Sequence, residues 1–161
     1  MKKIIALTLV VLCLFALAGC SDVQKDDKVS VFTFYGENEY VSVTNGTVVL
    51  NGEEEVFSGG ILEVLNEEVF SDAVYWSAEF YIAKGSEKKT VYISAVEDLS
   101  DTAQVSISGD LGKIAGGNVI TESGNSDTDD LINNLFMIFT VRNAEGEENT
   151  YELHMQVEKV Y

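Results

Sequence analysis

The sequence of 161 residues contains no proline, only one histidine and only two cysteines. Cys13 lies within an apolar N-terminal run, so a chain that loses this run retains Cys20 alone and forms neither an internal disulfide nor a cysteine-rich metal site. His154 falls on the polar face of a strand expected over 150–160, where we interpret it as a surface residue rather than the base of a serine hydrolase. We expect no zinc and no other cofactor.

Basic residues are also scarce. Ten lysines and arginines accompany 27 aspartates and glutamates, which gives a net charge of −17. Removing residues 1–19, which contain Lys2 and Lys3 but no acid, lowers this charge to −19. Such a chain lacks the basic face that nucleic acids require, and it is repelled by anionic lipid head groups. Disorder is not expected, because seven tyrosines and eight phenylalanines supply a core.

One long apolar run is present, from Ile4 to Leu17, and it follows the basic pair Lys2 and Lys3. The run is shorter than the roughly 20 residues that span a bilayer, and it fits the apolar core of a secretory signal, which has about 7–15 residues. Small residues follow it, and then a cysteine: Ala18, Gly19 and Cys20. The segment therefore predicts export.

This order of charge, apolar run, small residues and cysteine resembles the lipobox of bacterial lipoproteins. The resemblance implies cleavage between Gly19 and Cys20 and attachment of lipid to the Cys20 thiol. It also implies an extracytoplasmic, membrane-anchored location, in the outer membrane if the cell is Gram-negative. An ordinary secretory signal with an incidental cysteine is the alternative. The chain then divides into a signal peptide (1–19), a lipidated cysteine with an acidic tether (20–28) and a folded domain (29–161).

The folded domain reads as short β-rich segments separated by glycine, asparagine and aspartate. Asn45 and Gly46 are the strongest hairpin signal, and Lys84 and Gly85 predict another turn. Acids precede an apolar step over 127–135, which favours one short helix. We expect an all-β fold: an antiparallel β-sandwich of immunoglobulin-like outline, with about eight or nine strands. The β-rich segments that predict these strands are 29–35, 39–44, 47–50, 61–65, 74–83, 90–96, 103–109, 135–141 and 150–160, with a weaker segment at 118–121.

A two-residue period divides segment 74–83 into two faces. Trp76 and Phe80 are assigned to the core. Tyr75, Tyr81 and Tyr92 are assigned to the outer face of the predicted hairpin, where exposed aromatic rings would bind a glycan or a partner protein. The alternative is that a second sheet or a loop covers these rings.

An acidic loop contains Asp127, Asp129 and Asp130, and the alternation of Asn125, Asp127 and Asp129 in it invites a calcium interpretation. An EF-hand loop that begins at Asn125 would require glycine at position 130 and glutamate at position 136, and the chain has Asp130 and Phe136 there. The motif fails, and a helix cap is the favoured reading of the loop, with a looser calcium site as the alternative.

Two further carboxylate clusters occupy 53–55 and 67–68. Glycoside hydrolases pair two carboxylates across a cleft, but adjacent acids on one strand point to opposite faces. Both clusters are therefore interpreted as solvated edges that discourage strand-to-strand aggregation.

Three segments of the domain, 32–39, 57–60 and 108–117, resemble small lipoproteins of unknown function in gut-type Gram-positive bacteria. That resemblance implies a compact β domain behind a lipobox and no particular activity. We expect a membrane-anchored, non-enzymatic module that binds a glycan or a basic protein. The alternatives are an envelope hydrolase that uses paired carboxylates and a purely structural envelope protein.

Overall fold

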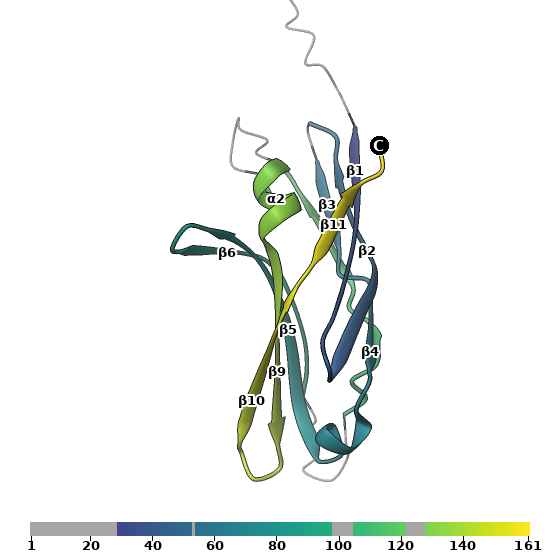
Figure 1. Cartoon of the computed structure of the whole chain (residues 1–161), viewed down its shortest axis with the longest axis vertical. Helices are drawn as coiled ribbons and strands as arrows, with labels where there is room; N and C mark the ends of the chain where they lie inside the picture. The colour runs from purple at the N-terminus through teal and green to yellow at the C-terminus, as the bar shows by residue number, and fades with distance from the viewer. Residues whose placement is uncertain (1–28, 53, 98–104, 122–127) are drawn as a thin grey trace, which may run out of the picture.

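The computed structural model of the chain describes residues 29–52, 54–97, 105–121 and 128–161. In this part of the chain, eleven β-strands form two antiparallel sheets, accompanied by one 3₁₀-helix and one α-helix (Figure 1). The predicted all-β, sandwich-like fold is confirmed. The strands outnumber the eight or nine expected because five of them have four residues or fewer.

Sheet A has seven strands in the order β11–β1–β2–β3–β8, and β4 joins it between β2 and β7. The long strand β2 pairs with β3 through its second half and with β4 through its first half. The 3₁₀-helix η1 (Glu67–Phe70) follows β4. The strands of sheet A are β1 (Ser30–Glu37), β2 (Val41–Leu50), β3 (Glu55–Ser58), β4 (Ile61–Val64), β7 (Gly109–Asp110), β8 (Lys113–Gly116) and β11 (Gln156–Lys159).

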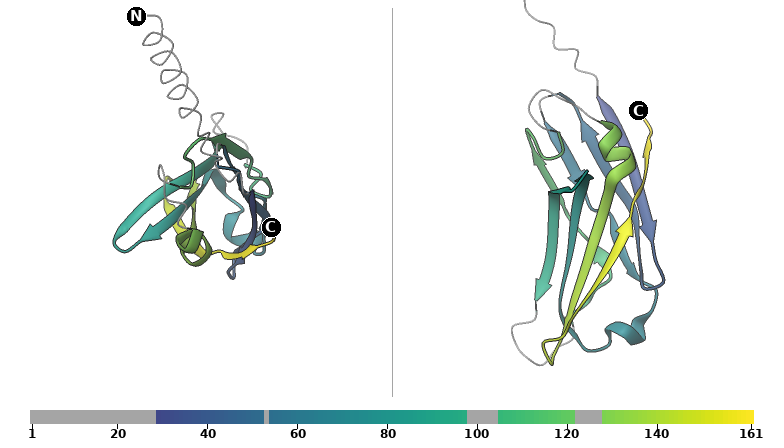
Figure 2. Two further views of the ribbon diagram at one scale, coloured as in Figure 1. Left: turned by 90° about the horizontal axis from the view of Figure 1, so that it is seen from above. Right: turned by 60° about the vertical axis from the view of Figure 1, so that its left-hand side comes forward.

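Sheet B has four strands in the order β10–β9–β5–β6. They are β5 (Ala73–Lys84), β6 (Glu87–Glu97), β9 (Leu135–Asn143) and β10 (Glu148–His154). The two sheets face each other, as the view from above shows (Figure 2). The helix α2 (Thr128–Asn134) leads into β9 and confirms the short helix predicted over 127–135. No helix in the described segments is long and apolar enough to cross a membrane.

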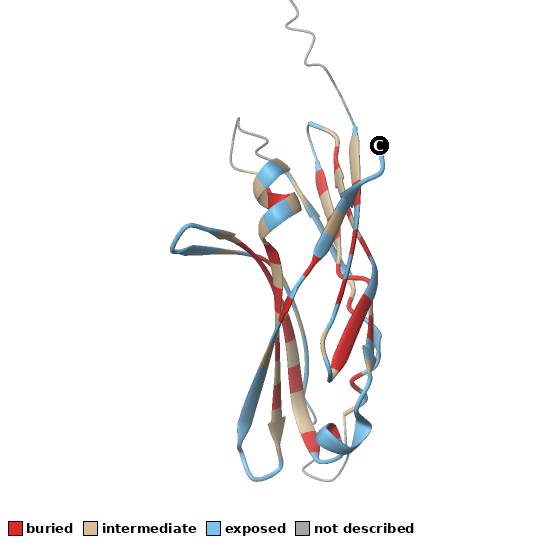
Figure 3. Cartoon of the chain, in the orientation of Figure 1, coloured by how far each residue is buried: buried red, intermediate tan, exposed pale blue. Residues whose placement is uncertain are grey.

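The core lies between the two sheets, where the buried residues gather (Figure 3). Alternation in β1 turns Phe32 and Phe34 inward and leaves Tyr35 exposed. Phe34 packs against Phe57 of the same sheet and Phe80 of the other, with ring centroids 5.3 Å and 5.7 Å away. Each fully buried side chain of this kind contributes about 1.5–3 kcal/mol of hydrophobic stabilisation. Phe80 is fully buried, as predicted.

Asn45 and Gly46 do not form the predicted hairpin. They lie inside the continuous strand β2, where Asn45 adopts a φ of 59° and the register with β1 shifts between Phe34 and Gly36. The left-handed conformation that suits a hairpin turn is used here for a β-bulge. The ring of Phe34 lies over Gly46 and occupies the place of a Cβ atom, so core packing selects glycine at this position.

The β5–β6 hairpin is confirmed, with Lys84 paired to Glu87 and Gly85 in the turn at a φ of 62°. Its register shifts between Phe80 and Tyr81, where one extra residue of β6 is accommodated. Because a shift of one residue reverses the faces of a strand, Ile93 lies on the outer face and is 56% exposed, although strict alternation from the buried Val91 would place it inward. The chain alternation alone does not reveal this bulge.

A single residue, Met155, separates β10 of sheet B from β11 of sheet A. Met155 is fully buried, and its amide donates a hydrogen bond to the carbonyl oxygen of Leu135 at 2.9 Å. β11 then pairs with β1, and the Val31 amide donates to the Tyr161 carbonyl oxygen at 2.8 Å. The start of β1 and the C-terminus therefore lie at the same end of the elongated domain (Figure 1).

Candidate functional site

The elongated domain has two ends, which differ in the residues that they carry. The near end is the one at which β1 begins and the chain ends; among the described residues it comprises 50–58, 82–90, 113–121, 128–134 and 157–161. The far end, opposite to it, holds η1 and the β9–β10 turn (Figures 1 and 2). It comprises residues 37–40, 61–72, 94–97, 105–108 and 142–150.

Charge is distributed unequally between these two ends. The near end has five lysines for six acids, whereas the far end has one arginine for ten acids, counted over the described residues. The near-end charges are Lys84, Lys88, Lys89, Lys113 and Lys159 with Glu54, Glu55, Glu87, Asp129, Asp130 and Glu158. The far-end charges are Arg142 with Glu37, Glu39, Glu63, Glu67, Glu68, Asp72, Glu97, Glu145, Glu147 and Glu148. Among the described residues, negative charge therefore concentrates at the far end.

Near-end charges are partly used to close the sandwich. Glu55 of β3 is buried, and its carboxylate accepts hydrogen bonds from the amides of Ile120 and Thr121 at 2.5 Å and 3.1 Å. Lys89 of β6 donates to the carbonyl oxygen of Ile120 at 2.8 Å. Residues 120–121 thus join Glu55 of sheet A to Lys89 of sheet B. The prediction that the 53–55 cluster is a solvated edge is wrong for Glu55, because the turn after β8 returns over it; Glu53 lies outside the described residues.

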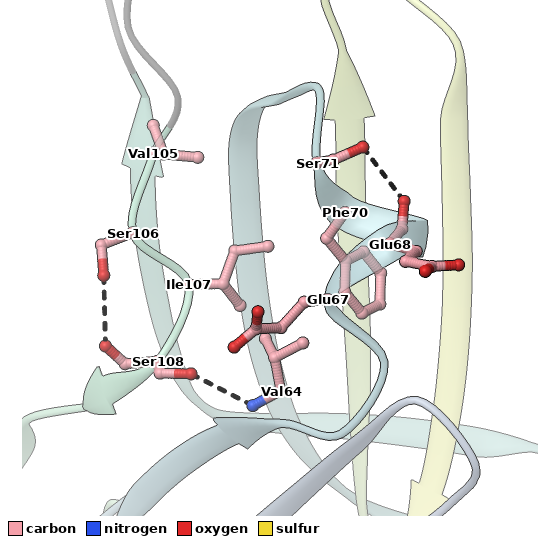
Figure 4. Close-up of a pocket in the computed structure, with 9 residues that line it drawn as sticks. All are labelled: Val64, Glu67, Glu68, Phe70, Ser71, Val105, Ser106, Ile107 and Ser108. Carbon is pink, nitrogen blue, oxygen red and sulfur yellow. Dashed lines mark hydrogen bonds between the residues drawn. The ribbon is translucent and has the colours of Figure 1, made fainter.

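The far end contains a groove between η1 and the segment 105–108, an open cavity of about 580 Å³ (Figure 4). Its apolar lining is Val64, Phe70, Val105 and Ile107, and Glu67 and Glu68 lie on its η1 side. Phe70 forms part of an aromatic cluster between the sheets, with its ring centroid 5.5 Å from Tyr151 and 5.8 Å from Phe139. The groove therefore has a floor that belongs to the core and a rim that carries negative charge.

Hydrogen bonds fix the walls of this groove. The indole of Trp76 donates to the Ser106 carbonyl oxygen at 3.0 Å, and the Val64 amide donates to the Ser108 hydroxyl oxygen at 3.1 Å. The Val105 amide donates to the Ala73 carbonyl oxygen at 3.1 Å. A cavity whose walls are held in this way is preorganised, so a ligand does not have to order it.

Glu67 and Glu68 are neighbours on one 3₁₀-helix, and both are exposed. The wall that faces them, residues 105–108, contributes serines and apolar side chains but no acid. Hydrolysis by paired carboxylates requires acids on opposite sides of the scissile bond. The described residues that line this groove do not have that arrangement.

The outer face of sheet B arranges two of the three predicted tyrosines in cross-strand rows. In one row Tyr81, Phe136 and His154 lie side by side, with centroid distances of 5.5 Å and 4.6 Å. Tyr81 is only 2% exposed, and the ammonium group of Lys88 lies 4.3 Å from its ring centre. Burial raises the pKa of Tyr81. Because the rings stack on one another, their flat faces are already occupied.

Tyr75 lies in another row of the same face. The guanidinium of Arg142 covers its ring at 4.8 Å and forms ion pairs with Glu97 and, at 3.9 Å, with Glu148. The single cation among the described far-end residues is therefore engaged by two carboxylates and one ring. The role of Arg142 could not be predicted from the sequence, because its partners come from the neighbouring strands β6 and β10.

Tyr92 is not on this face, so the prediction of a three-tyrosine surface is wrong. Tyr92 pairs with Phe80 after the register shift and therefore points inward. Its ring lies 5.9 Å from that of Phe57, and its hydroxyl donates to the Leu111 carbonyl oxygen at 2.7 Å. Tyr92 is a bridge between the sheets.

The acidic loop is only partly described, since Asp127 lies outside the described residues. Asp129 is exposed in the first turn of α2, and Asp130 forms an ion pair with Lys84 at 3.5 Å and accepts a hydrogen bond from Asn134. No cluster of three or more metal-ligating side chains occurs in the ranges that the structure describes. The candidate residues Gly19 and Cys20 also lie outside those ranges, and their roles stay predictions.

His154 is exposed, as expected, and its Nε2 lies 2.9 Å from the carbonyl oxygen of Asn133. The groove-lining residues of 105–108 were missed, because the sequence there reads as an ordinary strand.

Comparison with models of protein families, with curated proteins and with solved structures finds no match to this chain.

Proposed function

We propose that the chain is exported, cleaved before Cys20 and held by lipid on that cysteine at the extracytoplasmic face of the membrane. There its β domain binds a cationic protein of the cell envelope and catalyses no reaction. The order of residues 2–20 supports the anchor. Two or more acyl chains give stable attachment, whereas one chain is marginal.

The unequal distribution of charge carries the proposal. Ten acids and one ion-paired arginine occupy the far end of the described domain, and the tether would attach at the other end, where β1 begins. An anchored molecule would thus present its most negative surface away from anionic head groups. A cationic protein would be steered to that surface by complementary charge, with a rate and an affinity that fall as salt rises.

The geometry favours a protein over a glycan as the ligand. Sugars stack on the open face of an aromatic ring, whereas Tyr81 and Phe136 stack on each other and Tyr75 is covered by Arg142. Tyr92 points into the sandwich. The aromatic rings of sheet B therefore support the sheet itself, and the charge of the far end is the stronger recognition element.

The proposal is tested with the full chain in phosphatidylcholine vesicles, floated on a density gradient with lysozyme as a basic probe protein. We expect lysozyme to float with the vesicles at about 20 mM salt and to be released at several hundred millimolar, where the Debye length falls to a few ångströms. An acidic probe protein of similar size is the control. Binding that is unchanged by salt, or no binding at low salt, contradicts the proposal.

The anchor is tested separately with the substitution Cys20→Ser, which removes the lipid acceptor. We expect the variant to lose palmitate labelling and to partition into the aqueous phase of a detergent extraction. Cys13→Ser, within the predicted signal peptide, is the matched control and should leave both readouts unchanged. Equal labelling of wild type and the Cys20 variant would overturn the lipoprotein assignment.

A further inference from the structure

We infer that the far-end groove binds an apolar side chain of the cationic partner, from an extended segment in which that side chain lies between lysine or arginine residues. The inference rests on the proposed function, since it takes the partner to be cationic. It adds the chemistry of the contact: an apolar anchor within an electrostatic surface.

The groove has the two properties that such a segment requires. Its interior is formed by Val64, Phe70, Val105 and Ile107, which provide an apolar surface for one aliphatic side chain (Figure 4). Glu67 and Glu68 on η1 supply carboxylates on one side of it. Lysine and arginine residues that flank the anchor would therefore meet negative charge as the anchor enters.

The wider surface extends the same complementarity. Glu63 of β4 and Asp72 after η1 are exposed, and Glu97 ends the edge strand β6. No lysine lies within the described far-end residues, and Arg142 is engaged by Glu97 and Glu148. A purely apolar ligand would leave these carboxylates unused, and a purely cationic one would leave the groove empty. A segment with both features uses the whole surface.

The walls of the groove are already ordered, and this favours one bound geometry. The hydrogen bonds from Trp76 to Ser106 and from Val64 to Ser108 hold segment 105–108 against sheet B and β4. The free energy gained from apolar burial is therefore not offset by an entropic cost of ordering this segment.

The experiment uses the full chain in phosphatidylcholine vesicles and two capped, dye-labelled pentapeptides. One has leucine at the centre of four lysines, and the other has glycine at the centre of four lysines. Fluorescence anisotropy is measured at low salt. Because burial of an aliphatic side chain in an apolar groove is favourable, we expect the leucine peptide to bind roughly tenfold more tightly than the glycine peptide.

A groove-filling substitution, Val105→Trp, separates the apolar contact from the charge. Val105 is half-buried on the wall of the groove, and the larger ring should remove the advantage of leucine over glycine while both peptides still bind. The matched control is Ile114→Trp, an exposed apolar residue of β8 at the near end, which should preserve the tenfold difference. The comparison of the two peptides on the wild type needs no variant, so it holds even if Val105→Trp does not fold.

Equal binding of the two peptides to the wild type would overturn the inference, and so would a preference for the leucine peptide that persists in Val105→Trp. Neither result would contradict the proposal that the partner is cationic. Failure of both peptides and of lysozyme to bind at low salt would overturn the proposed function as well. The two failures are therefore distinguishable.

Discussion

The two ends of this domain have acidic residues in common but use them differently. At the near end, Glu55 is buried and accepts three main-chain and side-chain hydrogen bonds from Ile120 and Thr121, and Lys89 completes the contact between the sheets. At the far end, most acids are exposed and face no cation among the described residues. Because like charges in proximity destabilise a compact state, folding stability does not explain the gathering of exposed acids there, apart from Glu97 and Glu148, which pair with Arg142. The acid that stabilises the fold and the acids that we propose to serve recognition thus lie at opposite ends of the domain.

The largest effect on stability is expected from a substitution at the near end. Glu55→Ala leaves the buried amide of Ile120 and the partly buried amide of Thr121 without their acceptor. Hydrogen bonds to a charged group contribute about 1.5–3 kcal/mol each, and the two amides share one carboxylate oxygen of Glu55. We expect the free energy of unfolding in urea to fall by roughly 3 kcal/mol. Glu54→Ala, at the exposed neighbouring position, should change it by less than about 0.5 kcal/mol. Equal effects of the two substitutions would contradict the role of Glu55.

A triple variant with Glu67→Gln, Glu68→Gln and Glu145→Gln removes three negative charges from the far end. Because three carboxylates leave the surface that would face the partner, lysozyme should bind roughly tenfold more weakly at low salt. The melting temperature should stay constant or rise slightly, since repulsion between these exposed groups is relieved.

Its control removes the same number of charges from exposed near-end positions, with Glu54→Gln, Glu87→Gln and Glu158→Gln. The net charge of the two triple variants is identical. We expect the near-end variant to retain most of the affinity, and equal losses in the two variants would show that net charge rather than its location governs binding.

A smaller effect with the opposite sign is expected at Arg142. Arg142→Met removes the far-end cation and its contacts with Glu97, Glu148 and Tyr75. The residue is partly exposed, so the loss of stability should be about 1 kcal/mol or less. Lysozyme should bind two- to threefold more tightly, roughly, because the surface becomes more negative. Weaker binding would indicate that Arg142 itself contacts the partner.

The smallest predicted effect is on the alkaline pH dependence of stability. Burial raises the pKa of Tyr81 and of Tyr151, and the carboxylate of Glu39, chiefly through a hydrogen bond, raises the pKa of Tyr40. The folded state then holds these protons more tightly than the unfolded chain. The contribution is complete below about pH 10, the ordinary tyrosine value, and is lost as pH rises through the folded pKa.

Urea unfolding between pH 8 and pH 11 measures this effect. The wild type should lose stability at the upper end of the range, and Tyr81→Phe should lose less, because one of the shifted groups is absent. Tyr35→Phe, at an exposed tyrosine of β1, is the comparison variant and should follow the wild type.

Much of the fold could be predicted from periodicity, including the core positions of Phe80 and Trp76 and the short helix before β9. Two features could not. Asn45 and Gly46 suit either a hairpin or a bulge, and only the ring of Phe34 over Gly46 decides between them. The bulge in β6 depends on pairing with β5, and it sends Tyr92 inward.

The candidate site was even less accessible to sequence reasoning. Its acids at 67–68 were visible as a cluster, but the opposite wall at 105–108 is brought to them by hydrogen bonds from Trp76 and Val64. The burial of Glu55 likewise depends on residues about 65 positions away in the chain. The segregation of charge between two ends is a property of topology, since each end combines several segments that are distant in sequence.

The position of β1 has a mechanical consequence. β1 enters at the near end, runs along the axis and is paired on both sides, with β2 and with β11. Hydrogen bonds between antiparallel strands lie perpendicular to the strands, so a pull on Ser30 along the axis loads both ladders in shear, many bonds at once. Peeling, which breaks bonds one after another, is the weaker geometry. A partner that tugs on the far end of an anchored molecule would therefore pull against the strand arrangement that resists force best.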